Sequence, residues 1–397
     1  MYLSRVEEAM YRGDYGGVVE TAIKVIVKVG EALGAERLVE VSHVHVSGVS
    51  YWNIGDPGLE YIESLSSSGA WFRVYTSVNP VCIDLGGDNG LFGREYASGQ
   101  KRIMEALERL GVDPVYTCIP YSFREPARHQ HLAWGESNAV AVANSVYGAR
   151  TNREGGPLTI AAAITGRTYY AGLHLMENRV VSTIVSISKD IVYNDLYASL
   201  IGLYIGEYVD GIPLIREGYR WSFYMVKEML ASSAASGSHS LVVLDGVTPR
   251  DTYLVSDRVD RVSIDKRSLD KFYEQVSSEP GVEGYTLAYI GCPHLDRRDL
   301  EYLVERVRRY KGLKRDVLFL VTIPYRYHGL VDGLVKTLES RGIHVAYGVC
   351  PIVSVLSRKP DKVLTNSGKA LFYLKRLHGF NVALGSIDDI VREVMVE

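Results

Sequence analysis

Residues 285–323, YTLAYIGCPHLDRRDLEYLVERVRRYKGLKRDVLFLVTI, decide the fold. An apolar run at 285–290 is followed by a charged stretch at 298–309, whose apolar residues recur every third or fourth position, and by a second apolar run at 317–323. A short apolar run indicates a buried strand, and the three-to-four spacing indicates a helix that buries one face. Strand, helix and strand in this order predict a parallel sheet covered by helices.

The same alternation extends in both directions along the chain. Towards the C-terminus it predicts strands at 344–349, 362–365 and 382–385 and helices at 330–341, 367–378 and 388–396. Towards the N-terminus it predicts strands at 38–46, 71–76 and 114–119 and helices at 18–33, at 101–110 and from the vicinity of residue 136. We expect several α/β domains, divided as an N-terminal region 1–190, a middle region 191–280 and a C-terminal region 281–397. The Ser- and Ala-rich stretch Ala231–Ser240 is expected to be a mobile connection.

The composition limits the class of protein. The chain has 397 residues, of which 23% are charged, and its net charge of −3 argues against a broad basic surface for nucleic acid. Its first residues, MYLSRVEE, lack the layout of a signal peptide, and its apolar stretches are too short to span a bilayer. We expect a cytoplasmic protein that has reduced cysteines and no nucleic-acid or membrane partner.

Three of the four cysteines have similar surroundings. Cys118 lies in TCIP, Cys292 in GCPH and Cys350 in VCPI, each after an apolar run and one or two residues before a proline. Three thiolates at strand ends can hold an iron–sulfur cluster and leave one iron open to substrate. The alternative is that all three are small apolar residues packed in a core, which is the interpretation that we prefer for Cys82.

A loop rich in Ser and Gly follows the strand expected at 38–46. In the stretch SHVHVSGVSY at 42–51, the free backbone amides after the strand can bind a carboxylate or a phosphate. The alternative is an ordinary strand that ends in a glycine turn. His43 and His45 lie on one face of this strand, but no companion Cys or carboxylate has the spacing of a zinc site.

Two further segments can bind anions at helix ends. The first is WGESN at 134–138, where Ser137 is the expected N-cap and Glu136 meets the positive end of the helix dipole. The loop after that helix carries Arg150 and Arg153, which can bind a carboxylate or a phosphate, although a capped helix with a solvated basic end explains the pattern equally well.

The second segment is NSGK at 366–369, which lacks the upstream glycine and the Ser or Thr of a Walker motif. It would supply the Lys369 ammonium and helix amides to an anion. The alternative here is an ordinary helix cap beside a surface lysine.

Together these segments resemble the aconitase X family over nearly the whole chain. The residues that carry the resemblance are His45–Tyr51, Asn79-Pro80, Glu136–Ala139, Ala143–Ser145, Gly148–Gly155 and the cysteine trio. The resemblance implies an aconitase-like arrangement of parallel-sheet α/β domains around a central cleft. It also implies a dehydratase whose iron–sulfur cluster, expected to be [4Fe-4S] with one open iron, is held by Cys118, Cys292 and Cys350. Some relatives are reported to hold a two-iron cluster instead.

The resemblance also implies a partner and a substrate. We expect the chain to lack the swivelling domain of aconitases, as in the archaeal form of the family, which pairs a large subunit of this length with a separate small one. That form dehydrates (R)-5-phosphomevalonate to trans-anhydromevalonate 5-phosphate in isoprenoid synthesis by the mevalonate route. The alternative within the family is dehydration of cis-3-hydroxy-L-proline. Outside enzymes, the alternative is a cluster-dependent RNA-binding iron sensor, against which the lack of an aromatic and basic stretch argues.

Residue roles follow from the resemblance by position. Substrate contact is expected from the following residues: Gly48, Val49, Ser50, Asn79, Pro80, Glu136, Ser137 and Lys369, with Arg150 and Arg153 as further candidates. Glu136 and Ser137 are also the candidate catalytic groups, and Glu136 would transfer a proton if burial raises its pKa. The main base is expected to be a serine of the small subunit.

Overall fold

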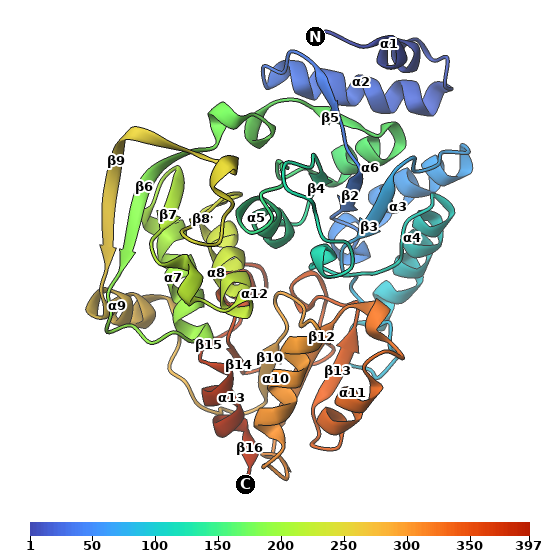
Figure 1. Cartoon of the computed structure of the whole chain (residues 1–397). Helices are drawn as coiled ribbons and strands as arrows, with labels where there is room; N and C mark the ends of the chain where they lie inside the picture. Colours follow the sequence, from blue (N-terminus) through green and yellow to red (C-terminus); the bar gives the residue numbers. More distant parts are fainter.

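The C-terminal third forms a five-stranded sheet of order β13-β12-β10-β14-β15, in which every neighbouring pair of strands is parallel. The computed structural model describes residues 1–397 and is drawn in Figure 1. The strands are β10 (Thr286–Ile290), β12 (Val317–Ile323), β13 (His344–Tyr347), β14 (Lys362–Thr365) and β15 (Val382–Leu384). The helices of this third are α10 (Arg297–Val307), α11 (Asp332–Glu339), α12 (Gly368–His378) and α13 (Ile387–Val394). The predicted alternation is therefore confirmed here, with small shifts at the ends of elements.

The parallel arrangement gathers three predicted site segments at one edge of this sheet. Cys292 follows β10, Cys350 follows β13, and the segment 366–369 follows β14. The C-terminal ends of parallel strands share one edge, where ligands of α/β proteins usually bind.

The middle of the chain forms a four-stranded parallel sheet of order β8-β7-β6-β9. Its strands are β6 (Val180–Ile187), β7 (Ile212–Ile215), β8 (Val243–Leu244) and β9 (Leu254–Ile264), and its helices are α7 (Asp195–Tyr208), α8 (Phe223–Ser236) and α9 (Lys266–Val276). Strand β6 lies before residue 190 but pairs with β7 and β9. The division of the chain at residues 190 and 280 stays a prediction.

Helix α8 corrects the expectation of a mobile connection at 231–240. Residues 231–235 lie within α8 and are buried, and the Ser232 hydroxyl donates to the Glu228 carbonyl one turn earlier. The helix packs against α5, α7 and α12. Small Ser and Ala side chains permit this close helix packing, so the composition that indicated a linker belongs to a central helix.

The N-terminal region forms a three-stranded parallel sheet of order β3-β2-β4. Its strands are β2 (His43–Val46), β3 (Tyr75–Val78) and β4 (Ala133–Trp134). Its helices are α1 (Arg5–Arg12), α2 (Gly17–Ala32), α3 (Tyr51–Ser67), α4 (Ala97–Arg109), α5 (Ser137–Ser145) and α6 (Gly156–Thr165). Two small antiparallel pairs complete the fold, β1 (Leu38–Glu40) with β5 (Arg167–Tyr169) and β11 (Gly312–Leu313) with β16 (Met395–Val396).

The prediction of a strand at 114–119 is wrong. The chain here makes only two backbone bonds to β3, from Asp113 N to Thr76 O and from Thr117 N to Val78 O. Between them Tyr116 adopts φ 39°, in the left-handed region that bulky residues seldom occupy, so a regular ladder cannot form. Cys118 therefore follows an irregular extended segment rather than a strand.

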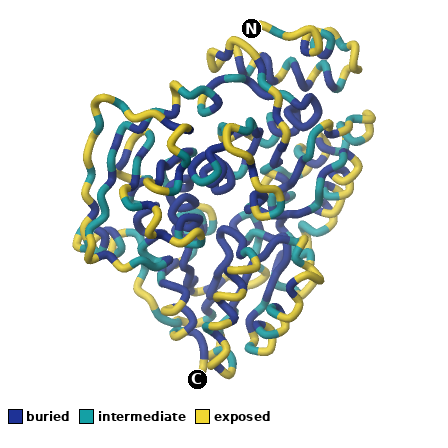
Figure 2. The backbone as a smooth tube through the Cα atoms, viewed as in Figure 1, coloured by how far each residue is buried: buried dark blue, intermediate teal, exposed yellow.

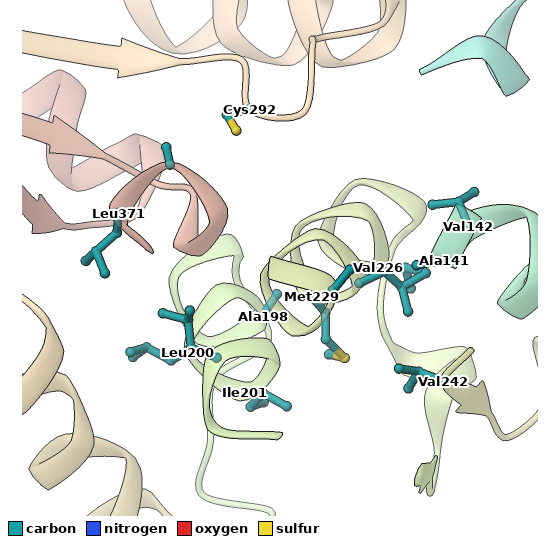
Figure 3. Close-up of a cluster of buried hydrophobic side chains, with 14 of the residues drawn as sticks. Ala141, Val142, Ala198, Leu200, Ile201, Val226, Met229, Val242, Cys292 and Leu371 are labelled. Atoms are coloured by element: carbon teal, nitrogen blue, oxygen red, sulfur yellow. The ribbon is translucent and has the colours of Figure 1, made fainter. Parts of the chain in front are cut away.

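A shared core joins the three sheets. Its members include Val142 of α5, Ile201 of α7, Met229 of α8, Leu371 of α12 and Cys292 (Figure 3). Figure 2 shows buried backbone running through the centre of the molecule, with exposed residues along its outer faces. None of the helices is long and apolar enough to cross a membrane.

Gly202→Ala tests the close crossing of α7 and α8. A Cβ at Gly202 would lie 2.2 Å from the Met229 carbonyl oxygen, so the helices must separate. We expect the free energy of unfolding in a denaturant titration to fall by about 1–3 kcal/mol. The control Gly333→Ala lies in α11, where nothing approaches within 4 Å, and should be neutral or slightly stabilising. Equal stability of Gly202→Ala and wild type would contradict this packing.

Candidate active site

Lys369 begins the site at the N-terminus of α12. The Ser367 hydroxyl caps this helix by accepting the Ala370 N–H at 3.1 Å. Lys369 is only 8% exposed, and its ammonium pairs with Glu136 and donates to the Ser137 hydroxyl at 3.1 Å. The alternative of a surface lysine is therefore wrong. The ion pair joins the C-terminal third to helix α5 of the N-terminal region.

Glu136 is the N-cap of α5, where the sequence predicted Ser137. Its Oε1 accepts the Asn138 N–H at 3.3 Å, and its Oε2 accepts the Asn79 side-chain N–H at 2.9 Å. Burial alone would raise the pKa of Glu136, but the charge of Lys369 and the hydrogen bonds from Lys369 and Asn79 lower it to about 2. The condition for proton transfer, a pKa raised by burial, is therefore not met.

A directed chain of hydrogen bonds supports Glu136 from the first sheet. His45 Nε2 donates to Asn79 Oδ1, which can only accept, so His45 Nδ1 accepts from the Ser77 hydroxyl, and Ser77 Oγ accepts from His43 Nε2, all at 2.8 Å. Burial lowers the pKa of His45 to about 4 and that of His43 well below its ordinary value, so both rings are neutral at pH 7. Both ring nitrogens of His45 are thus engaged in hydrogen bonds, which argues against a zinc site on this strand.

The loop after β2 packs closely against the turn before α5 and against the first residue of α6. Gly48 has φ 70°, a left-handed conformation that glycine adopts readily. A Cβ at Gly135 would lie 2.2 Å from Ser47 Oγ, and one at Gly156 would lie 2.8 Å from Ser47 O. Ser50 Oγ donates to the Val353 carbonyl at 2.6 Å, which ties this loop to the segment after Cys350. The predicted contacts Val49 and Pro80 are buried in the same region.

The cysteine trio lies near Lys369. Burial raises the pKa of all three thiols, that of Cys118 to about 12. The charge of a Cys350 thiolate would raise the pKa of both Cys118 and Cys292, and the Lys369 charge lowers the pKa of all three. The thiols and the ammonium therefore share one electrostatic neighbourhood. Cys82 is buried beside the loop after β2, with its thiol near Ser50 and its Sγ 3.0 Å from Gln100 Oε1, as expected of a core residue.

The three thiols supply the donor set of an iron–sulfur cluster. No three Cys, His, Asp or Glu side chains are grouped closely enough to hold one metal ion. A cluster spreads its thiolate ligands over separate irons, so its ligands converge from farther apart. All four cysteines are free, and Cys118 Sγ accepts the His294 N–H at 3.2 Å. Three thiols with a nearby ammonium and an N–H donor suit the donor set and the negative charge of such a group.

Arg150 and Arg153 make their contacts elsewhere. Arg150 donates to the His174 carbonyl at 2.7 Å, and Arg153 donates to the Ala234 carbonyl at 3.4 Å. Neither forms a hydrogen bond or ion pair with Glu136 or Lys369. Their role in anion binding stays a prediction.

Sequence reasoning missed three residues that hold the site. Ser77 links the two histidines, Asn138 donates to the Cys118 carbonyl at 3.1 Å, and His294 contacts the Cys118 thiol. Asn138 and His294 each lie within two residues of a predicted site residue, a signal that could have marked them. Ser77 also lies two residues from the predicted Asn79, but its hydrogen-bond partners His43 and His45 come from the neighbouring strand, which no local pattern shows.

Comparison with known families decides the relationship. Family models described as the first, second and third domains of aconitase X match residues 1–177, 181–274 and 285–396. The chain belongs to the aconitase X family. The resemblance on which we based the fold class is thereby confirmed.

Individual relatives of this aconitase X protein support the family assignment. It is 37% identical to the phosphomevalonate dehydratase large subunit of Aeropyrum pernix, over 99% of this chain and 100% of that one. It is 29% identical to the cis-3-hydroxy-L-proline dehydratase of Hypocrea jecorina, over 97% of this chain and 67% of that one. The crystal structure of Thermococcus kodakaraensis aconitase X (holo-form) superposes with a TM-score of 0.89 at 32% identity, covering 99% of this chain and 100% of that one. Both named relatives are dehydratases, so the chain is a hydro-lyase.

Glu136→Gln tests the buried ion pair. We expect a loss of about 3–5 kcal/mol in the free energy of unfolding, because the Lys369 ammonium keeps its burial and loses its counter-charge. The double variant Glu136→Gln/Lys369→Met removes both charges and should recover most of the loss. As a control, Glu301→Gln breaks the exposed pair with Arg297 and should change little. A denaturant titration in which Glu136→Gln matches wild type would contradict the pairing.

Glu154→Gln tests a second buried carboxyl, in the loop after α5. Burial raises the pKa of Glu154 from 4.5 to about 7. Between these values the unfolded chain loses the proton and the folded chain keeps it, so stability falls as pH rises through this window. We expect the free energy of unfolding of Glu154→Gln, relative to that of wild type, to rise by up to about 3 kcal/mol between pH 4.5 and 7.5. The exposed control Glu60→Gln should show the same pH dependence of the free energy of unfolding as wild type. If Glu154→Gln also shows that dependence, the raised pKa is refuted.

Proposed function

We propose that this chain is the large subunit of an iron–sulfur hydro-lyase that converts (R)-5-phosphomevalonate to trans-anhydromevalonate 5-phosphate. The observation that carries the proposal is the pairing of the buried Lys369 ammonium with the Glu136–Ser137 cap, where it also interacts electrostatically with Cys118 and Cys292. A buried ammonium can donate to an anionic group of a small hydroxy acid. The Aeropyrum relative, named a large subunit, matches this chain over its full length and supports both the substrate and a small-subunit partner.

The three thiols of Cys118, Cys292 and Cys350 would hold the cluster, which we take to be [4Fe-4S]. When bound, its open iron supplies the Lewis acid that makes the substrate C3 hydroxyl a better leaving group. The thiols have raised pKa values in the protein alone, so cluster binding must displace their protons, and the Lys369 charge favours that displacement.

The chain's own residues would bind and orient the substrate. The Lys369 ammonium and the Ser137 hydroxyl face each other and can both bond a substrate oxygen at the reacting end. The amides of Gly48, Val49 and Ser50 precede α3, at whose N-terminus Gln100 Oε1 accepts the Tyr51 N–H at 2.9 Å, and these amides would meet an anionic group of the substrate. The side chain of Asn79 and the adjoining Pro80 would complete the contact, with Arg150 and Arg153 as outlying anion binders.

The proton at C2 needs a base that this chain does not provide from Glu136. Glu136 stays ionised to about pH 2 and is held by Lys369 and Asn79, so its part is to position those donors. Ser137 donates to Glu136 and accepts from Lys369, which sets its hydroxyl in the site. We propose that the base is a serine of the small subunit, so the isolated large chain should be inactive.

The alternative substrate is cis-3-hydroxy-L-proline. The hydroxyproline dehydratase relative is a longer protein of which this chain spans 67%, whereas the phosphomevalonate dehydratase relatives match end to end. The higher identity to the phosphomevalonate dehydratase large subunits, 37% and 33% against 29%, favours the phosphorylated substrate.

Anaerobic turnover of (R)-5-phosphomevalonate by the chain co-expressed with a candidate small subunit tests the proposal. We expect Cys292→Ser to lower the rate by roughly 10³-fold or more, because Lewis-acid assistance is worth several kcal/mol. Cys82→Ser, the loss of a buried thiol that does not belong to the trio, should stay near wild type. The dehydrated product is followed by mass spectrometry.

Three outcomes would count against parts of the proposal. Product formed by the large chain alone contradicts a base from the small subunit. Turnover of cis-3-hydroxy-L-proline but not of phosphomevalonate replaces the substrate. Equal rates for Cys292→Ser and Cys82→Ser remove the cluster role of Cys292.

A further inference from the structure

His294 lies where the three cysteine-bearing loops meet. It is two residues beyond Cys292 and 1% exposed, so its ring is enclosed by protein. Its backbone N–H donates to Cys118 Sγ at 3.2 Å, across 176 residues of sequence. Its ring Nε2 is 2.9 Å from the carbonyl of Val349, the residue before Cys350, across 55 residues. A single residue is therefore linked to all three loops: it belongs to the loop of Cys292 and forms one hydrogen bond to each of the other two.

The direction of these bonds can be assigned from their partners. The Val349 carbonyl can only accept, so Nε2 carries the ring proton. Nδ1 then holds a lone pair and accepts from the Thr117 hydroxyl, 3.4 Å away. The Thr117 hydroxyl in turn accepts the Ile119 N–H at 3.1 Å, so the ring also braces both sides of Cys118. One neutral tautomer satisfies every contact.

These contacts bear on thiol geometry more than on overall stability. Displacing the ring frees the Val349 carbonyl and hence the position of Cys350, and it removes the support beside Cys118. Partners that orient metal ligands without binding the metal typically contribute 10–100-fold to its retention. Hydrogen bonds to cluster thiolates also tune the reduction potential, and the His294 N–H is such a donor.

We infer that His294 is a positioning residue that sets Cys118, Cys292 and Cys350 in the mutual geometry that one cluster requires. This inference rests on the proposed cluster site. It assigns a role to a residue that forms no hydrogen bond with the substrate loops or with Lys369.

Three substitutions separate the contacts. His294→Gln keeps an N–H donor near the position of Nε2 and can still bond the Val349 carbonyl. His294→Asn places an amide group only near the position of Nδ1 and cannot reach the Val349 carbonyl. His294→Ala removes both hydrogen-bonding groups of the ring. His239→Ala is the matched control, because His239 is another buried histidine, 7% exposed, in the connection after α8.

Each full-length variant is loaded anaerobically with iron and sulfide. Iron and sulfide per chain, the electron paramagnetic resonance spectrum of the reduced protein, and the rate of absorbance loss to a chelator are then measured. We expect His294→Ala and His294→Asn to lose the cluster roughly 10–100-fold faster than wild type and to show broadened spectra. His294→Gln should stay close to wild type, as should His239→Ala.

Failure of the proposed role of His294 can be distinguished from failure of the proposed cluster site. A wild-type chain that takes up no iron and sulfide overturns the cofactor proposal and this inference together. A wild type that loads normally, with His294→Ala equally retentive, overturns this inference alone. Equal loss by His294→Ala and His239→Ala, or by His294→Gln and His294→Ala, also overturns it, because the effect would then not come from the Nε2 donor.

Discussion

The buried pair of Lys369 and Glu136 is the contact on which the rest of the site depends. Two charges removed from water are tolerated only when their geometry is good and their remaining bonding capacity is satisfied. Lys369 belongs to α12 and Glu136 caps α5, so the pair forms only when two distant regions bring two helix N-termini to one point. Helix α8, packed against both α5 and α12, supplies the common support for that arrangement.

The neutral chain behind Glu136 has one consistent direction. From His43 through Ser77, His45 and Asn79, every assigned donor points towards the carboxylate. Aligned dipoles of this kind stabilise a negative charge without adding a positive one, and burial keeps both rings unprotonated at pH 7. Glu136 is thus held from one side by a cation and from the other by oriented amide and imidazole groups.

Sequence patterns predicted the C-terminal third well because its apolar runs are short and bounded by amphipathic helices. They failed at 114–119, since an apolar stretch does not reveal that Tyr116 is left-handed, and at 231–240, since small residues occur in tight helix packing as well as in linkers. Lys369 was predicted from its local motif. Its pairing with Glu136, 233 residues away, and the resulting low pKa of that carboxyl depend on tertiary contacts that no local pattern encodes.

The bond from Ser50 Oγ to the Val353 carbonyl spans 303 residues. At a synthesis rate of 5–20 residues per second, Val353 is therefore made roughly 15–60 s after Ser50. The N-terminal sheet leaves the ribosome with its loop edge unfinished, and only the last eighth of the chain completes it. Contacts between residues this far apart in the sequence slow folding, because the entropy of loop closure is lost before the contact forms. This edge of the N-terminal sheet is thus completed late in synthesis. A chain truncated before residue 353 cannot form the bond from Ser50 to Val353.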